Sequence, residues 1–149
     1  MKFTHVNLIA KDWKRLAAFY QEVFGCTPVP PERSYAGEWL DQATGVSNAS
    51  IQGVHLRLPG HGDDGPTLEI FQYGTMPDHP DVRSNTPGFS HIALAVEDVE
   101  EVVAAMLARG GTAVGALTER VVPEVGRLVF QYVADPEGNI VEVQNLKKV

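Results

Sequence analysis

The stretches Thr4-His5-Val6-Asn7-Leu8 and Ser90-His91-Ile92-Ala93-Leu94 share one pattern and decide the fold. The second follows the first by 86 residues, and this offset continues without a gap through the segment that comes after each. Further on, Leu68-Glu69-Ile70 aligns with Val141-Glu142-Val143 at an offset of 73. The chain therefore contains a repeat, and each copy carries one histidine and one glutamate at equivalent positions.

Each repeat is expected to begin with a strand. Residues 4–10 and 90–96 alternate between large apolar side chains and polar or small ones, which is the period of a β-strand with one buried face. In both segments the histidine belongs to the side opposite the large apolar residues. The sequence therefore predicts that both histidines face away from the apolar core.

An amphipathic helix is expected after each first strand. Asp12 and Asp98 are suited to N-cap positions, and apolar residues then recur at i, i+3, i+4 and i+7. The helices should end at glycines with left-handed backbone, Gly25 and Gly110-Gly111. The apolar face of each helix should cover the apolar face of a sheet.

The remaining strands complete two βαβββ modules. Strands are expected near 51–58 and 67–73 in the first repeat and near 112–116, 127–134 and 139–145 in the second. The turn Asp135-Pro136-Glu137-Gly138-Asn139 should join the last two as a hairpin. The prediction is an α+β fold in which one curved, eight-stranded mixed sheet forms a cup with helices packed outside. Residues 1–149 are taken as one domain, with modules at 1–75 and 89–149 and a linker at 76–88.

The composition limits the classes of binding partner that this protein is expected to have. The 149 residues are enough for one ordinary domain. A net charge of −7 argues against a nucleic-acid backbone or an anionic membrane as the main partner. The lone Cys26 excludes an internal disulfide and fits a reducing compartment, so a cytoplasmic protein that binds a small molecule is expected.

Four residues form the candidate metal site, namely His5, Glu69, His91 and Glu142. A single strand histidine is more often satisfied by a backbone hydrogen bond than by a metal. Here both glutamates lie inside otherwise apolar strands, and burying two unpaired carboxylates would cost several kcal/mol unless a cation offset it. A mixed imidazole and carboxylate set suits one divalent ion of Zn, Ni, Co, Mn or Fe.

Other residues are weaker candidates for contacts with a substrate. Phe71 and Tyr73 share the expected face of Glu69, and Arg57 could meet an anionic group. Trp39 lies within residues 28–50, which match nothing in the second repeat and could form a substrate wall or an ordinary loop. The other histidines, His55, His61 and His79, are interpreted as loop or surface residues.

The sequence resembles the vicinal oxygen chelate superfamily, which includes glyoxalase I, extradiol dioxygenases, and fosfomycin and bleomycin resistance proteins. The motifs that carry the resemblance are His5 with Asp12, Phe19-Tyr20 and Phe24-Gly25, then Leu68-Glu69-Ile70, His91-Ile92-Ala93 with Asp98, and Asp135-Pro136-Glu137-Gly138-Asn139 with Glu142. The resemblance implies paired βαβββ modules, a divalent metal held at the positions of His5, Glu69, His91 and Glu142, and often a homodimer.

The resemblance implies a metal-dependent isomerase, epimerase or lyase. A substrate with vicinal oxygens would be polarised by the metal, and Glu69 or Glu142 would act as the catalytic carboxylate that moves a proton. Glutathione-dependent glyoxalases typically carry an Arg and an Asn where this chain has Ile9 and Tyr73, which weakens that choice. An extradiol-type dioxygenase and a non-enzymatic protein that binds an antibiotic are the alternatives.

Overall fold

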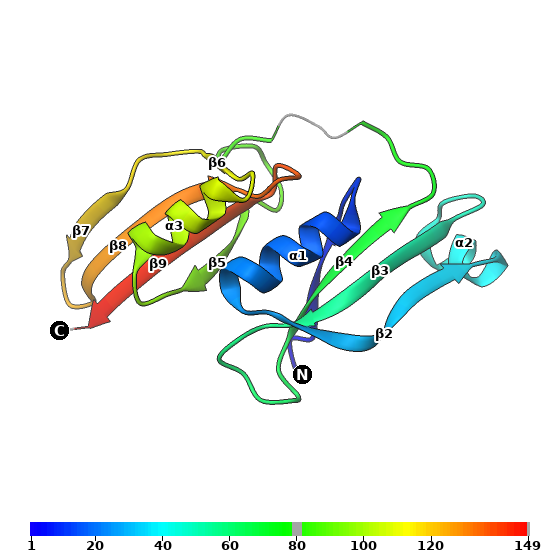
Figure 1. Cartoon of the computed structure of the whole chain (residues 1–149), viewed down its shortest axis with the longest axis horizontal. Coiled ribbons are helices and arrows are strands. Elements are labelled where there is room, and N and C mark those ends of the chain that lie inside the picture. Colours follow the sequence, from blue (N-terminus) through cyan, green and yellow to red (C-terminus); the bar gives the residue numbers. More distant parts are fainter. Residues whose placement is uncertain (79–81, 149) are drawn as a thin grey trace. The chain divides into compact units, whose positions relative to one another are not determined.

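A computed structural model describes residues 1–78 and 82–148 (Figure 1). The chain divides into two compact units, Met1–His79 and Pro80–Val149, and each is described here by itself. The boundary falls inside the segment 76–88 that the sequence assigns to the linker. His79, expected to be a loop residue, lies outside the described residues.

The first unit contains four strands and two helices among its described residues. In chain order they are β1 (His5–Ile9), α1 (Trp13–Phe24), β2 (Thr27–Ala36), α2 (Glu38–Thr44), β3 (Ser50–Arg57) and β4 (Thr67–Tyr73). The sheet order is β1-β4-β3-β2. Strand β1 runs parallel to β4, whereas β3 is antiparallel to both β4 and β2.

Among the described residues, the second unit has a similar layout with one more strand and one helix fewer. Its described elements are β5 (His91–Ala95), α3 (Val99–Ala108), β6 (Thr112–Ala113), β7 (Thr118–Val122), β8 (Gly126–Ala134) and β9 (Ile140–Lys148). The sheet order is β5-β9-β8-β6, and β7 also pairs with β8. The first strand of the unit is again parallel to the last, so the repeat seen in the sequence is a repeat of topology.

Helices α1 and α3 each pack on one face of their own sheet, as the apolar periodicity predicts (Figure 1). The Asp12 carboxylate caps α1 by accepting from the Arg15 N–H at 3.0 Å, and Gly25 ends the helix at a φ of 69°. The Asp98 carboxylate caps α3 by accepting from the Glu101 N–H at 2.9 Å. The core beneath α1 and α3 is built from even positions of β3 and β4, odd positions of β8 and β9, and the inner faces of the two helices. Its most buried members include Leu16, Tyr20, Val54, Leu56, Leu68, Ile70, Met106, Val133, Val141 and Val143.

The α+β class and the paired modules are confirmed. The described strands number nine and form two sheets, one in each unit, where the sequence predicts eight strands in one sheet. The hairpin turn after β8 is also confirmed, because the Asp135 carboxylate accepts from the N–H groups of Glu137 and Asn139 at 2.9 and 3.0 Å.

Residues 28–50, left unassigned by the repeat, hold β2 and α2. Strand β2 is at the sheet edge, where proline is tolerated because no ladder bond is needed on the outer side, and its pairing with β3 shifts between Val29 and Arg33. Helix α2 places Leu40 against Ala49 and Ile51. In the described part of the chain no helix is long and apolar enough to span a membrane.

Candidate metal centre

Glu69 is the centre of the candidate site in the first unit. It lies between Leu68 and Ile70, which are buried on the α1 side, so the alternation of β4 turns its side chain to the opposite face. Its residue exposure is only 9%. Such a carboxylate requires partners, because a buried charge without them is costly.

Three side chains supply those partners. The Nδ1 of His5 lies 3.4 Å from Glu69 Oε1, and the Nε2 of His55 lies 3.3 Å from the same oxygen. The Asn7 amide donates to Glu69 Oε2 at 3.4 Å. The pairing of His5 with Glu69 therefore joins the first two predicted ligands, whereas Asn7 and His55 are additions that the sequence did not reveal.

His55 belongs to the site, contrary to its interpretation as a surface histidine. It lies directly across from Glu69 in the pairing of β3 with β4, and its ring makes an edge contact with Phe71 at 5.7 Å between centroids. Burial lowers the pKa of His55, Glu69 opposes this, and the charges of Arg33 and His5 lower it further. A neutral imidazole can donate Nε2–H to the carboxylate.

The second unit repeats the arrangement around Glu142. The Nε2 of His91 lies 3.0 Å from Glu142 Oε2, which joins the other two predicted ligands. Tyr132 lies directly across from Glu142 in the pairing of β8 with β9. Burial raises the pKa of Tyr132, and the charge of Glu142 and a hydrogen bond to it raise the pKa further. The phenol therefore remains a hydrogen-bond donor to the carboxylate.

The two units have equivalent positions around their glutamates, although different residues fill some of these positions. His55 and Tyr132 occupy the same cross-strand position relative to the two glutamates. A hydroxyl precedes each histidine, and the oxygens of Thr4 and Ser90 both lie 3.3 Å from the Nδ1 of the ring that follows. Such contacts hold each imidazole ring in a fixed orientation, which a metal-binding histidine also needs.

The spacing of the paired atoms fits shared coordination. Two ligand atoms that are each about 2.1 Å from one ion, at angles of about 90–109°, lie roughly 3.0–3.4 Å apart. The His91–Glu142 and His5–Glu69 separations, 3.0 and 3.4 Å, fall in that range. Across the described residues, no group of three or more His, Cys, Asp or Glu side chains is arranged to hold a metal ion. Each unit thus brings together one histidine and one glutamate of the predicted set.

The predicted substrate contacts have other partners in the structure. Phe71 and Tyr73 pack against the cluster of Leu40, Ala49 and Ile51 beneath α2. Trp39 is 57% exposed on α2.

Arg57 and Trp39 also have neighbours of their own. The Nη1 of Arg57 lies 2.9 Å from the carboxylate of Asp63, whose side chain is 94% exposed. The ring of Trp39 meets Tyr35 edge-on at 5.6 Å between centroids. These contacts give Phe71, Tyr73, Arg57 and Trp39 packing or pairing roles, and their contact with a substrate stays a prediction.

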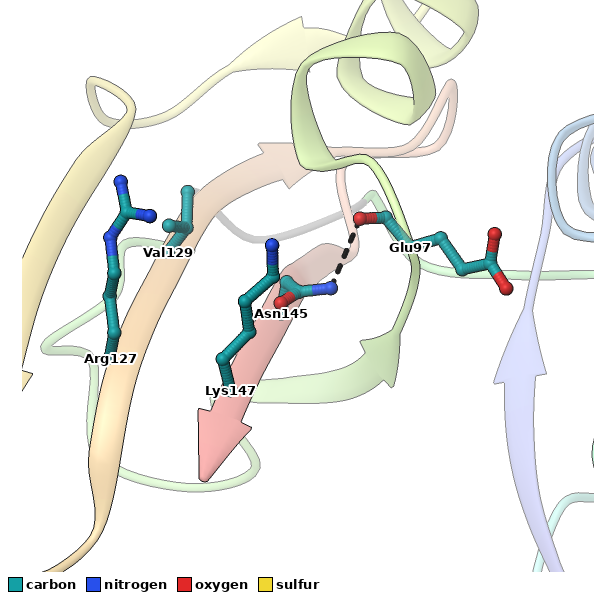
Figure 2. A pocket seen from close by; sticks show the side chains of 5 residues that line it. All are labelled: Glu97, Arg127, Val129, Asn145 and Lys147. Carbon is teal, nitrogen blue, oxygen red and sulfur yellow. Dashed lines mark hydrogen bonds between the residues drawn. The ribbon is translucent and has the colours of Figure 1, made fainter. Parts of the chain in front are cut away.

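A small pocket lies on the other face of the second sheet. Figure 2 shows the five side chains that line it, from Glu97, Arg127, Val129, Asn145 and Lys147. The Asn145 amide donates to the carbonyl oxygen of Glu97 at 3.0 Å, and the Arg127 guanidinium forms two bonds of 2.6 Å with Glu119. Because strand side chains alternate, Asn145 and Glu142 belong to opposite faces, and this pocket is separate from the candidate metal centre.

Comparison with known proteins agrees with this fold and these motifs. The Glyoxalase/Bleomycin resistance protein/Dioxygenase superfamily matches residues 2–143, and the chain belongs to this superfamily. No curated protein gives a significant match.

Solved structures share the fold at low sequence identity. A glyoxalase family protein from Bacillus cereus is 19% identical, with a TM-score of 0.81 over 98% of this chain and 94% of that one. The fosfomycin resistance protein FosX from Listeria monocytogenes is 20% identical, with a TM-score of 0.61 over 98% of this chain and 91% of that one. A second FosX structure, complexed with Mn(II) and sulfate, gives a TM-score of 0.54 at 20% identity, over 98% of this chain and 93% of that one.

Proposed function

We propose that this protein is a metal-dependent isomerase, epimerase or lyase that acts on a small molecule with vicinal oxygens. The observation that carries the proposal is the same in both units: a histidine at the start of the first strand contacts a poorly exposed glutamate on the last strand. The proposed ligands of a single divalent ion are His5, Glu69, His91 and Glu142.

The donor set supports a transition metal. Two imidazoles and two carboxylates are intermediate in hardness, which suits Mn, Fe, Co, Ni or Zn better than Ca. The Mn(II) complex of FosX, a protein of the same fold, adds support for manganese among these metals. When bound, such an ion would polarise a substrate carbonyl as a Lewis acid and stabilise negative charge on its oxygen.

The carboxylates then account for proton transfer. One glutamate would take a proton from the carbon next to the polarised carbonyl. Return of that proton by the same carboxyl to the neighbouring atom would isomerise the substrate, whereas delivery of a proton by the other glutamate to the opposite face of the same carbon would invert it. Neither route changes the substrate's atoms in number. The partners of the two glutamates differ, since Asn7 and His55 contact Glu69 whereas Tyr132 donates to Glu142. This difference gives the two carboxylates separate roles in the proposal.

Solvent exchange tests the proposal across several classes of substrate at once. Protein loaded with Mn(II), Ni(II) or Zn(II) is incubated in D2O with 2-hydroxy-carbonyl compounds, thiohemiacetals and acyl thioesters, and deuterium at carbon is followed by NMR. We expect incorporation that requires metal and is lost in Glu69→Gln or Glu142→Gln. Metal-dependent incorporation that survives in both variants would contradict the proposed role of the carboxylates.

The same samples separate the alternative functions. Oxygen uptake with catechols in the Fe(II) or Mn(II) form would support an extradiol-type dioxygenase. Opening of fosfomycin, or its tight retention without turnover, would support a resistance protein, and FosX is a structure of similar fold. The complete His and Glu set favours proton transfer, because four protein ligands leave less room for oxygen at the metal.

The proposal includes a cytoplasmic homodimer. Subunit mixing tests whether the His5–Glu69 pair shares an ion with the His91–Glu142 pair of the same chain or of a second chain. If His5 and Glu69 of one chain share an ion with His91 and Glu142 of a second chain, mixing Glu69→Gln with Glu142→Gln produces heterodimers with one intact site. If both pairs come from one chain, every site in the mixture carries one defect. Metal content and deuterium exchange of the mixture distinguish the two arrangements.

A further inference from the structure

The arginines of the first sheet have hydrogen-bonding capacity that the fold does not use. Arg33 Nη1 and Arg57 Nε are both shielded from solvent, and among the described residues neither atom has a hydrogen-bond partner. A shielded N–H without a partner is unfavourable, and more so in a charged group. Two such groups within one four-stranded sheet are donors that the acceptor atoms of a ligand could satisfy.

Both arginines belong to the face that carries Glu69. Residues directly opposite each other in paired strands share a face, and His55 lies across from Glu69 while Arg57 follows His55 by two positions in β3. Arg33 lies across from Gly53, which precedes His55 by two positions. The register therefore sets Arg57 and Arg33 on either side of His55 along the strand direction.

The interaction of Arg33 with His55 supports this placement. Burial is the main cause of the lowered pKa of His55, and the charge of Arg33 is among the further causes. The guanidinium is therefore close to the imidazole that contacts Glu69. The Glu69 carboxylate already has His5, His55 and Asn7 at its two oxygens, so the positive charge of Arg33 is left for another acceptor.

Arg57 is a weaker candidate than Arg33 for the main anion contact. Its Nη1 is already bound to Asp63, although an ion pair with a carboxylate as exposed as that of Asp63 adds little stability. Arg33 is half-buried at the edge of the sheet, where side-chain rotation can present its planar fork of donors. That fork matches the paired oxygens of a carboxylate or of a phosphorus oxyanion.

We propose that Arg33 binds an anionic group of the substrate beside the candidate metal centre, with Arg57 as a secondary contact. The substrate class is then a small molecule that carries a carboxylate, phosphate or phosphonate near its vicinal oxygens. The word substrate rests on the proposed function, whereas anion binding by Arg33 does not depend on a metal. Arg33 was not among the residues that the sequence indicated.

The test uses the metal-free protein of residues 1–149, so that its result does not depend on the metal site. Protein treated with EDTA is freed of the chelator by gel filtration and titrated in a zwitterionic buffer with acetate, methylphosphonate and neutral acetamide. The arginine Nε–Hε signals are followed in 15N-HSQC spectra, and the Arg33 signal is assigned by its absence in Arg33→Gln. We expect a saturable shift of that signal with acetate or methylphosphonate and none with acetamide.

Variants decide whether Arg33 is the receptor. Arg33→Gln should weaken anion binding by at least about tenfold, because the lost bond involves a charged donor. Arg33→Lys keeps the charge without the fork and should recover part of the affinity. Arg127→Gln is the matched control, because Arg127 is already paired with Glu119, and it should bind as the wild type does.

The outcomes separate the two proposals. If the Arg33 signal does not respond to either anion, or if Arg33→Gln binds as tightly as the wild type, the inference is wrong. If Arg33→Gln does not fold, the inference is still tested by the wild-type titration and by the affinity of Arg33→Lys for the same anions. Whichever of acetate or methylphosphonate binds more tightly identifies the source of the anionic group. Loss of the proposed metal chemistry with anion binding intact would refute the proposed function alone.

Discussion

Gly53 allows β3 to lie close against β4 beside the candidate site, and replacing it with alanine should damage the first unit. A Cβ at this position would overlap the carbonyl oxygen of Ile70 and Cδ1 of Phe71, and it would lie 2.9 Å from Phe71 Cα. Two of the three atoms belong to the backbone, so a rotamer change of Phe71 cannot relieve the clash. The strands themselves must move apart.

The expected cost is at the upper end of the overpacking range, about 3 kcal/mol. For a chain of this size each kcal/mol shifts Tm by about 2–4 °C, so Gly53→Ala should melt about 6–12 °C lower than the wild type. Because Phe71 packs against His55, the same variant should also broaden or shift the His55 ring resonances. The wild-type positions of those resonances provide the reference.

Gly62→Ala is the matched control in the same unit, because a Cβ there meets nothing within 4 Å. Its Tm should stay within about 2 °C of the wild type, as for most exposed substitutions. Circular dichroism melts of the three proteins, with guanidinium titrations to obtain free energies, provide the measurement. If Gly53→Ala had the same Tm as Gly62→Ala, the close contact between β3 and β4 would be refuted.

Two further predictions concern the core and a helix end. Cys26 is 3% exposed and burial raises its pKa to about 11, so a thiol reagent at pH 8 should modify it only after unfolding in guanidinium, and rapid modification of the native protein would contradict its burial. Asp98→Ala should cost about 1 kcal/mol by removing the cap of α3. Asp98→Asn should retain most of that stability in guanidinium titrations, and equal stabilities of the alanine variant and the wild type would exclude a capping role.

The elements that the sequence predicts correctly are those whose pattern is local. Strands β1 and β5 alternate strictly, and α1 and α3 combine an aspartate cap with a helical apolar stripe. Each signal requires only the residues of the element itself. The histidine and glutamate pairs follow from the repeat, since equivalent positions in two copies of one topology acquire equivalent neighbours.

The elements that were missed depend on their surroundings. Strand β2 contains prolines that favour a loop in isolation, and it exists because β3 offers a free edge. Strand β7 is almost wholly exposed and therefore carries no apolar alternation. Helix α2 is short, with Leu40 as its buried residue, which leaves little periodicity to detect.

The additional site residues depend on hairpin register. His55 and Tyr132 become neighbours of the two glutamates because their hairpins place them directly across the strand pair. Loop length sets that register, and the two hairpins have loops of different length. Asn7 was more accessible to sequence reasoning, since it follows His5 by two positions on the same face. The position of Arg33 on the sheet depends on the shifted pairing of β2 with β3, so the sequence alone could not show that it lies near His55.

The central claim is that His5, Glu69, His91 and Glu142 bind one shared ion, and elemental analysis tests it most directly. Wild type, His5→Ala and Glu142→Ala are purified in parallel, loaded with Mn(II) or Ni(II), desalted and measured for metal per chain, with circular dichroism to show that each is folded. Both variants should lose most of the metal, although one substitution lies in each unit. Full occupancy in either folded variant would contradict it.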